Sequence, residues 1–172
     1  TVPTTWFDSL NALLCVISGP LTALLWQKLA ARPQGDISIF KKLGIGLAFL
    51  GIGYIYYAVI DIVRGDSKPT VLLLIIFFLF LTLGEMFFSP LGNAFIGQYS
   101  PSRLLAIMSA VWGLGIFAAA KLYGNLYAFA FSGKFAFSKA CITIAAIAFV
   151  STVILFAIDG KLMSLVKDKD EA

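Results

Sequence analysis

The sequence lacks histidine entirely, has only two cysteines, and carries few charged residues for its length. Charged residues make up 13% of the 172 residues, whereas a soluble domain usually has about 25%. Cys15 and Cys141 lie singly inside apolar runs, so no metal-ligand spacing and no disulfide are predicted. Zinc motifs, phosphate-binding loops and credible nucleophile–base pairs are also missing. The sequence therefore predicts no metal site and no bound cofactor, and it argues against an enzyme.

Hydrophobic residues take the place of the missing charges and make up 60% of the chain. A chain of this size leaves much of its surface exposed, so a larger core cannot hide so many apolar side chains. A membrane span needs roughly 20 mostly apolar residues, and five segments meet this requirement: 4–27, 43–63, 70–97, 104–131 and 138–158. The two-residue alternation that barrel strands require is not sustained anywhere.

These segments predict an all-α fold, a polytopic transmembrane helix bundle of about five spans that forms a single domain over residues 1–172. Lys and Arg favour the cytoplasmic side of a membrane. One side of the predicted bundle has four of them, and the other has eight: Lys28, Arg32, Lys41, Lys42, Arg103, Lys161, Lys167 and Lys169. In a plasma or bacterial inner membrane, the start of the chain is thus predicted outside and the tail 159–172 in the cytoplasm.

Glu85 is the first candidate for function, because it lies about fifteen residues into the third span, roughly 22 Å from its start. An ionisable group at that depth is costly without a partner and is a functional hypothesis by default. Burial disfavours the charged form of a carboxyl group, and a nearby cation restores it. Such a group is suited to carrying a proton or pairing with an amine. The alternative is a structural carboxyl that hydrogen-bonds a neighbouring helix.

Two further ionisable residues form a candidate ion pair on the predicted outer side. Lys121 lies in the fourth span and Asp8 lies at a shallow depth in the first. Lys121 could instead extend its ammonium group outward to the interface, and Asp8 could be interfacial. Trp112 lies inside the fourth span, where its indole N–H needs a partner, although core packing is the simpler interpretation.

Two prolines lie inside spans, Pro20 in the first and Pro90 in the third. Each removes a backbone hydrogen bond and bends a helix. Ser89 precedes Pro90 and lies four residues after Glu85, on the same helix face. Broken helices around a midplane polar group are typical of secondary transporters. Pro20, Ser89 and Pro90 are therefore predicted to lie at kink or gating positions.

Small residues recur in two of the spans and predict close helix packing. The second span contains Gly44, Gly46, Gly51 and Gly53, and the fourth contains Gly115 and Gly124 in small-xxx-small pairs.

The residues around Glu85 resemble a known family. Gly84-Glu85-x-x-x-Ser89-Pro90-x-Gly92 is similar to the tenth-helix signature of the proton-dependent oligopeptide transporters, a branch of the major facilitator superfamily. Trp6-Phe7-x-Ser9-Leu10-Asn11 resembles the segment that opens helix eight, and Trp112 lies where the family has a helix-eleven tryptophan. The resemblance runs along nearly the whole chain, as helices eight to twelve of a partial C-terminal domain.

The resemblance implies import of di- and tripeptides by alternating access, with the proton as coupling ion. Asn11 and Glu85 would receive the amino end of the peptide, Glu85 would take part in proton coupling, and Trp112 would line the peptide pocket. The implied partners are the peptides, protons, the lipid bilayer and the N-terminal half of the transporter, which this chain lacks; nucleic acid is not among them. Ala12 and Ile116 depart from the residues that the family has at those positions.

The absence of an initiator methionine agrees with a piece of a longer chain. Two other functions stay open at this point. One is a facilitator-type carrier of another small solute. The other is a membrane assembly subunit that does not transport, in which Glu85 and Lys121 bind the helices of a partner.

Overall fold

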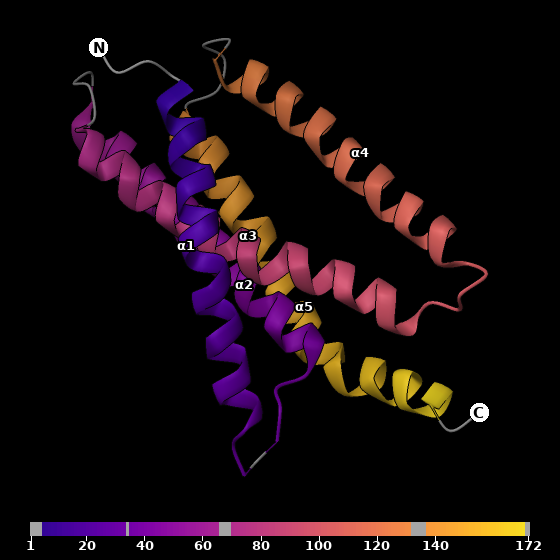
Figure 1. The fold of residues 1–172 in the computed structure, drawn as a ribbon. Helices are drawn as coiled ribbons and strands as arrows, with labels where there is room; N and C mark the ends of the chain where they lie inside the picture. The colour runs from indigo at the N-terminus through magenta and orange to yellow at the C-terminus, as the bar shows by residue number, and fades with distance from the viewer. Residues whose placement is uncertain (1–4, 34, 66–69, 132–136, 171–172) are drawn as a thin grey trace.

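Five long α-helices make up the chain in the computed structural model, which describes residues 5–33, 35–65, 70–131 and 137–170 (Figure 1). They are α1 (Thr5–Ala30), α2 (Ile39–Arg64), α3 (Val71–Tyr99), α4 (Leu105–Phe131) and α5 (Phe137–Asp170). All five are long and apolar enough to cross a membrane. The predicted all-α bundle of about five spans is confirmed.

Four of the five helices, all but α4, are longer than the apolar segments that predict them. The largest difference is in α5, where the predicted span ends at residue 158 but the helix continues through Asp170. Hydropathy marks only the apolar part of a helix, while residues such as Lys, Leu and Met propagate a helix in water equally well. The position of this segment relative to the membrane stays a prediction.

The helix α2 packs along α5 and along α3, and α1 crosses over α3 (Figure 1). The helices α2 and α3 approach each other closely at Gly46 and Gly84. A Cβ atom at Gly84 would lie 2.6 Å from Leu50 Cγ and 2.9 Å from the Gly46 carbonyl oxygen. Only glycine allows two backbones to meet this closely, and such contacts drive helix association in lipid. The predicted packing role of the α2 glycines agrees with these contacts.

The helix α4 differs from the others because it stands apart from the bundle (Figure 1). Every described side chain of α4 except Trp112 is exposed. A Cβ atom at Gly115 or Gly124 would meet nothing within 4 Å. Gly115 and Gly124 of α4 therefore pack closely against no other part of the described chain, unlike the glycines of α2.

The start of α2 is tied to α5 by polar contacts. Ser38 is the N-cap of α2, and its hydroxyl oxygen accepts a hydrogen bond from the Lys41 backbone N–H at 3.3 Å. The same hydroxyl donates to Asp159 of α5, whose carboxylate also lies 3.1 Å from Lys41 Nζ. Asp159 is only 6% exposed, so these two partners compensate a charge that would be costly to bury alone.

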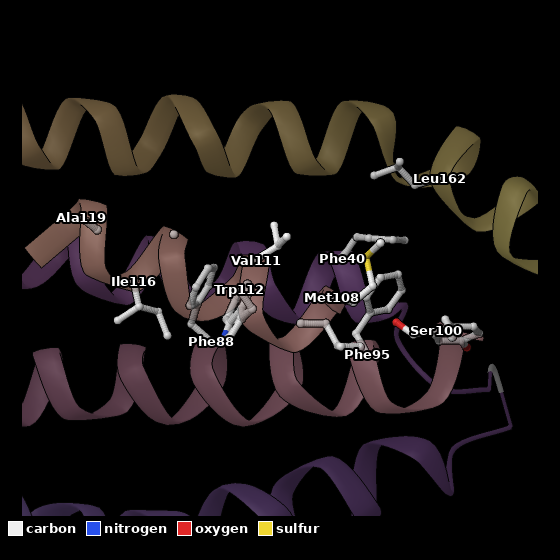
Figure 2. Close-up of a pocket in the computed structure, with 13 residues that line it drawn as sticks. Phe40, Phe88, Phe95, Ser100, Met108, Val111, Trp112, Ile116, Ala119 and Leu162 are labelled. Carbon is white, nitrogen blue, oxygen red and sulfur yellow. The ribbon is translucent and has the colours of Figure 1, made fainter. Parts of the chain in front are cut away.

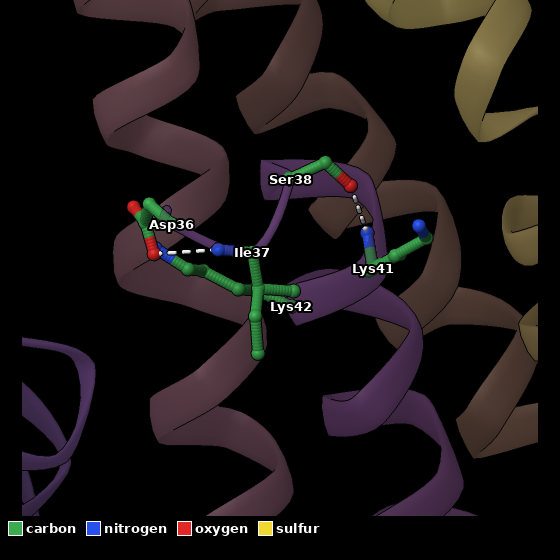
Figure 3. A network of polar contacts seen from close by, with 5 residues as sticks. All are labelled: Asp36, Ile37, Ser38, Lys41 and Lys42. Atoms are coloured by element: carbon green, nitrogen blue, oxygen red, sulfur yellow. Dashed lines mark hydrogen bonds and ion pairs between the residues drawn. The ribbon is translucent and has the colours of Figure 1, made fainter. Parts of the chain in front are cut away.

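The end of α1 also contacts the start of α2. Lys42 Nζ lies 2.6 Å from Asp36 Oδ2 and 5.2 Å from the centre of the Trp26 ring, a cation–π contact. Asp36 also accepts a hydrogen bond from the Ile37 backbone N–H, as Figure 3 shows beside the Ser38–Lys41 contact. Asp36 and Ser38, just before α2, are thereby bonded to Lys42 and Lys41 in the first turn of that helix.

We expect Gly84→Ala to destabilise the fold by about 1–3 kcal/mol, because the new methyl group overpacks the α2–α3 contact. Gly97→Ala is the matched control in the same helix, since a Cβ there would meet nothing within 4 Å. That control should be neutral or slightly stabilising, because alanine favours helix over glycine. Thermal unfolding in detergent measures both. Equal melting temperatures for the two variants would contradict the close contact.

Candidate functional site

Glu85 is the middle residue of the 29-residue helix α3 and its one charged residue. Its side chain is exposed on the described bundle. Acids inside membrane spans almost always point toward a bundle interior or a water-filled cavity. The exposed face of α3 around Glu85 is therefore the face that a polar ligand or another part of a transporter would meet.

One stripe of α3 carries Glu85 together with Thr82, Ser89 and Gly92. These residues are spaced by three or four positions and so share a face of the helix. The polar and small side chains of this stripe interrupt a helix that is otherwise strongly apolar. Two residues that the sequence analysis selected on other helices, Asn11 of α1 and Trp112 of α4, contact this stripe.

At one end of the stripe, Thr82 connects α3 to Asn11 of α1. The Thr82 hydroxyl donates a hydrogen bond of 2.8 Å to Asn11 Oδ1. Thr82 is fully buried, while Asn11 is half-buried. Since Thr82 lies one turn before Glu85, the hydrogen bond brings the Asn11 amide to the same part of α3 as the acid.

At the other end of the stripe, Gly92 seats Trp112 of α4. A Cβ atom at Gly92 would lie 2.5 Å from Trp112 Cη2, so the glycine makes room for the indole. The ring of Phe88 stacks on that of Trp112 with the centres 5.8 Å apart. The Trp112 Nε1 atom is buried and has no hydrogen-bond partner among the described residues. A buried indole N–H normally has one, so this donor is available to a partner from outside the described chain.

A cavity of about 830 Å³ opens beside Trp112; α3 and α4 supply most of its lining, with Phe40 of α2 and Leu162 of α5 (Figure 2). Its walls are apolar, and they include Phe88, Phe95, Met108, Ile116 and Leu162. Neither Asn11 nor Glu85 lines this cavity. The structure therefore brings Asn11 to the helix of Glu85 through Thr82, and it places Trp112 farther along the same stripe without enclosing all three in one pocket.

The stripe separates Glu85 from the seat of Trp112. Gly92, which seats Trp112, lies seven residues after Glu85, or about 10 Å along the helix axis.

The predicted kink positions lie within unbroken helices. Pro20 is inside α1 and Pro90 is inside α3, and both helices continue past them. Near Pro90, the Asn93 side-chain amide donates to the Ser89 carbonyl oxygen at 3.1 Å. Because Pro90 has no N–H to donate, this part of α3 has one backbone hydrogen bond fewer. The gating role of Pro20, Ser89 and Pro90 stays a prediction.

The predicted ion pair between Asp8 and Lys121 stays untested, because the side chain of Asp8 lies outside the described part of the structure. Lys121 is exposed on α4, in keeping with a side chain that reaches outward.

Sequence reasoning missed Thr82 and Phe88, and it treated Gly92 only as part of a motif. Both Thr82 and Phe88 lie three residues from Glu85, and Gly92 lies seven residues after it. The helical period was therefore a signal that could have found them. The contacts themselves could not be found that way, since Asn11 is 71 positions from Thr82.

Five apolar helices long enough to cross a membrane, with a charged residue in the middle of α3, define the class of the molecule as a multi-pass α-helical membrane protein. A profile of the POT family matches residues 1–142. The chain belongs to the POT family, the proton-dependent oligopeptide transporters, a family of membrane transporters and not of enzymes. The resemblance drawn from the sequence is confirmed at this level.

Individual relatives give the same result. The chain is 34% identical over 133 residues to the peptide transporter YePEPT of Yersinia enterocolitica. The match covers 74% of this chain and 26% of that relative. It is 28% identical over 127 residues to the dipeptide and tripeptide permease B of Aeromonas hydrophila, covering 72% of this chain and 25% of that one. The chain thus spans about a quarter of the length of these curated relatives.

A solved structure of a peptide transporter POT in complex with sulfate superposes on the chain with a TM-score of 0.79. The sequence identity is 28%, and the match covers 94% of this chain and 32% of that one. The five-helix arrangement is therefore the arrangement of a part of a POT transporter.

Proposed function

We propose that this chain is the C-terminal part, helices eight to twelve, of a transporter that imports di- and tripeptides by alternating access and is driven by protons. The observation that carries the proposal is the exposed acid Glu85 in the middle of α3, on a stripe that also seats Asn11 and Trp112. The names of the relatives, peptide transporter and dipeptide and tripeptide permease, support the substrate class.

In this proposal the α3 stripe is one wall of the substrate site. The carboxylate of Glu85 and the amide of Asn11 receive the ammonium group of the peptide, which offers three hydrogen-bond donors. Trp112 lies beside the remainder of the peptide, where its ring provides apolar contact and its Nε1 a donor. The opposite wall comes from the N-terminal half of the transporter, since the chain spans only a quarter of the relatives' length.

Glu85 also carries the proton in this mechanism. Its two ligands are the proton and the ammonium group of the peptide. The ionised carboxylate pairs with the ammonium group, whereas the protonated carboxyl group is neutral and does not. Binding of either ligand then shifts the balance between two arrangements of the bundle. The basic ends of the helices are proposed to face the cytoplasm of a cell, with the start of the chain outside and the segment from residue 159 inside.

The test is uptake of a labelled dipeptide into vesicles that contain the complete transporter, of which this chain is a part. We expect uptake against the concentration gradient when the vesicle interior is alkaline, and only equilibration when the proton gradient is dissipated. Competition by unlabelled di- and tripeptides, and none by amino acids, nitrate or sugars, would separate this function from that of a carrier for another solute. Absence of any saturable solute uptake would favour the assembly-subunit alternative.

A further inference from the structure

The hydroxyl group of Thr82 donates its hydrogen bond to a side chain of a different helix, to Asn11 Oδ1 at 2.8 Å. Thr152 of α5 also reaches another helix, but it donates to backbone carbonyl oxygens, that of Gly44 in α2 and that of Ala148 in its own helix. In contrast, Thr22 donates to the Gly19 carbonyl, Thr143 to the Lys139 carbonyl and Ser151 to the Ile147 carbonyl, all within their own helices. A threonine inside a helix commonly bonds back to its own backbone in that way. Thr82 forgoes this local bond for one that joins α3 to α1.

The position of the contact indicates what it controls. Thr82 has an exposure of 0%, so its hydroxyl has no access to water as a substitute partner. The side chain of Asn11 is only half-buried and has two chemically different ends, a carbonyl oxygen and an NH₂ group. The hydrogen bond from Thr82 holds the Asn11 amide with its oxygen toward α3. Without the hydroxyl group, the amide would lose the partner on α3 that holds it in this orientation.

We propose that Thr82 is a positioning residue that orients the Asn11 amide so that its oxygen faces the α3 stripe beside Glu85, and thereby selects ligands with a cationic amino end. This inference rests on the proposed function. The Asn11 oxygen has two lone pairs, and Thr82 uses one of them. The second remains for the ammonium group of a peptide, next to the carboxylate one turn farther along α3. If the amide were turned, its NH₂ group would face the ammonium group, and two groups that both donate cannot form a hydrogen bond.

Thr82 therefore acts on affinity and not on the chemistry of the proton, which belongs to Glu85. Loss of the orienting hydrogen bond is expected to raise the KM for a dipeptide about three- to tenfold, the range that corresponds to the net contribution of one hydrogen bond. The maximal rate with a saturating dipeptide and a fixed proton gradient should change by less than about twofold, because the saturated site already holds the amide in its productive orientation.

The experiment compares variants of the complete transporter in vesicles. Thr82→Val keeps the shape and removes the hydroxyl group, and Thr82→Ser restores a hydroxyl group at the same place. Thr143→Val is the matched control, because it removes a hydroxyl group that bonds only within its own helix. Asn11→Ala and the double variant Thr82→Val/Asn11→Ala complete a cycle that tests whether Thr82 acts through Asn11.

The proposal expects a raised KM for Thr82→Val, wild-type values for Thr82→Ser and Thr143→Val, and no further loss when Thr82→Val is added to Asn11→Ala. A merely structural hydroxyl would instead lower the melting temperature and the maximal rate, and its effect would add to that of Asn11→Ala. That pattern, or a KM unchanged in Thr82→Val, would overturn the proposal.

The two proposals fail in different ways. If the wild-type protein takes up dipeptides and Thr82→Val matches it in KM, only the positioning role is wrong and the proposed function stands. If the wild-type protein shows no saturable dipeptide uptake, the proposed function is wrong and the positioning role falls with it. If Thr82→Val cannot be purified in folded form, Thr82→Ala and Thr82→Ser give the same comparison with and without the hydroxyl group.

Discussion

Replacing Glu85 by glutamine is expected to abolish the accumulation of dipeptide that a proton gradient drives. Glutamine has nearly the same shape as glutamate and keeps a hydrogen-bonding head, but it neither binds nor releases a proton. One proton that moves through 100 mV is worth about 2.3 kcal/mol, which corresponds to a concentration ratio of roughly fifty. In a Glu85→Gln variant this ratio should fall to about one, whereas downhill exchange of dipeptide needs no net movement of protons.

The measurement is the ratio of internal to external labelled dipeptide with an imposed proton gradient, for the complete transporter in vesicles. Lys121→Gln is the control, since it removes the charge of another intramembrane residue that is exposed on α4 and lies off the α3 stripe. It should leave the accumulation ratio within about twofold of the wild type, and Glu85→Asp, which keeps a titratable group, should retain part of it. Full accumulation in Glu85→Gln would show that another group carries the proton.

The fold was predictable because the membrane constrains it so strongly. Every backbone polar group in a bilayer must be bonded internally, so a long apolar run has few structures available besides a helix. The runs therefore gave the number and order of the helices directly. The helix ends were less predictable, as α5 shows, because the polar residues between 159 and 170 continue the helix beyond its apolar part.

The site was predictable only where a single residue is conspicuous by itself. A lone charged residue at the centre of α3 identifies Glu85 without knowledge of any contact. Thr82 is unremarkable in the sequence, since its importance comes from Asn11 on another helix. Asp159 is similar, because its partner Ser38 lies 121 positions away. Pairs of this kind depend on how helices cross, and no local pattern specifies a crossing.

Gly92 was recognisable in the sequence as part of a motif, but its contact with Trp112 of α4 is seen only in the structure. We expect Gly92→Val to displace Trp112, because even the first atom of a side chain at this position would lie 2.5 Å from Trp112 Cη2. Trp112 is the one described side chain of α4 that is not exposed. Its displacement should therefore loosen α4 from α3 and cost about 1–3 kcal/mol in stability, as overpacking does elsewhere.

The same displacement should weaken the binding of dipeptides, because the ring of Trp112 is proposed to lie beside the peptide, about 10 Å along α3 from Glu85. We expect the KM to rise about fivefold or more and the melting temperature to fall in the same variant. Gly97→Val is the matched control, since a Cβ at Gly97 meets nothing within 4 Å and the residue lies on the same helix.

A second substitution separates displacement of the indole from a general disturbance of α3. With Trp112→Leu, the smaller side chain leaves space for a valine at position 92, so the double variant Gly92→Val/Trp112→Leu should recover most of the lost stability. It should not recover dipeptide affinity, because the indole ring is still missing. If stability also failed to recover, or if Gly92→Val behaved like Gly97→Val, Gly92 would not be the seat of Trp112, and α4 would be held to the bundle by other contacts.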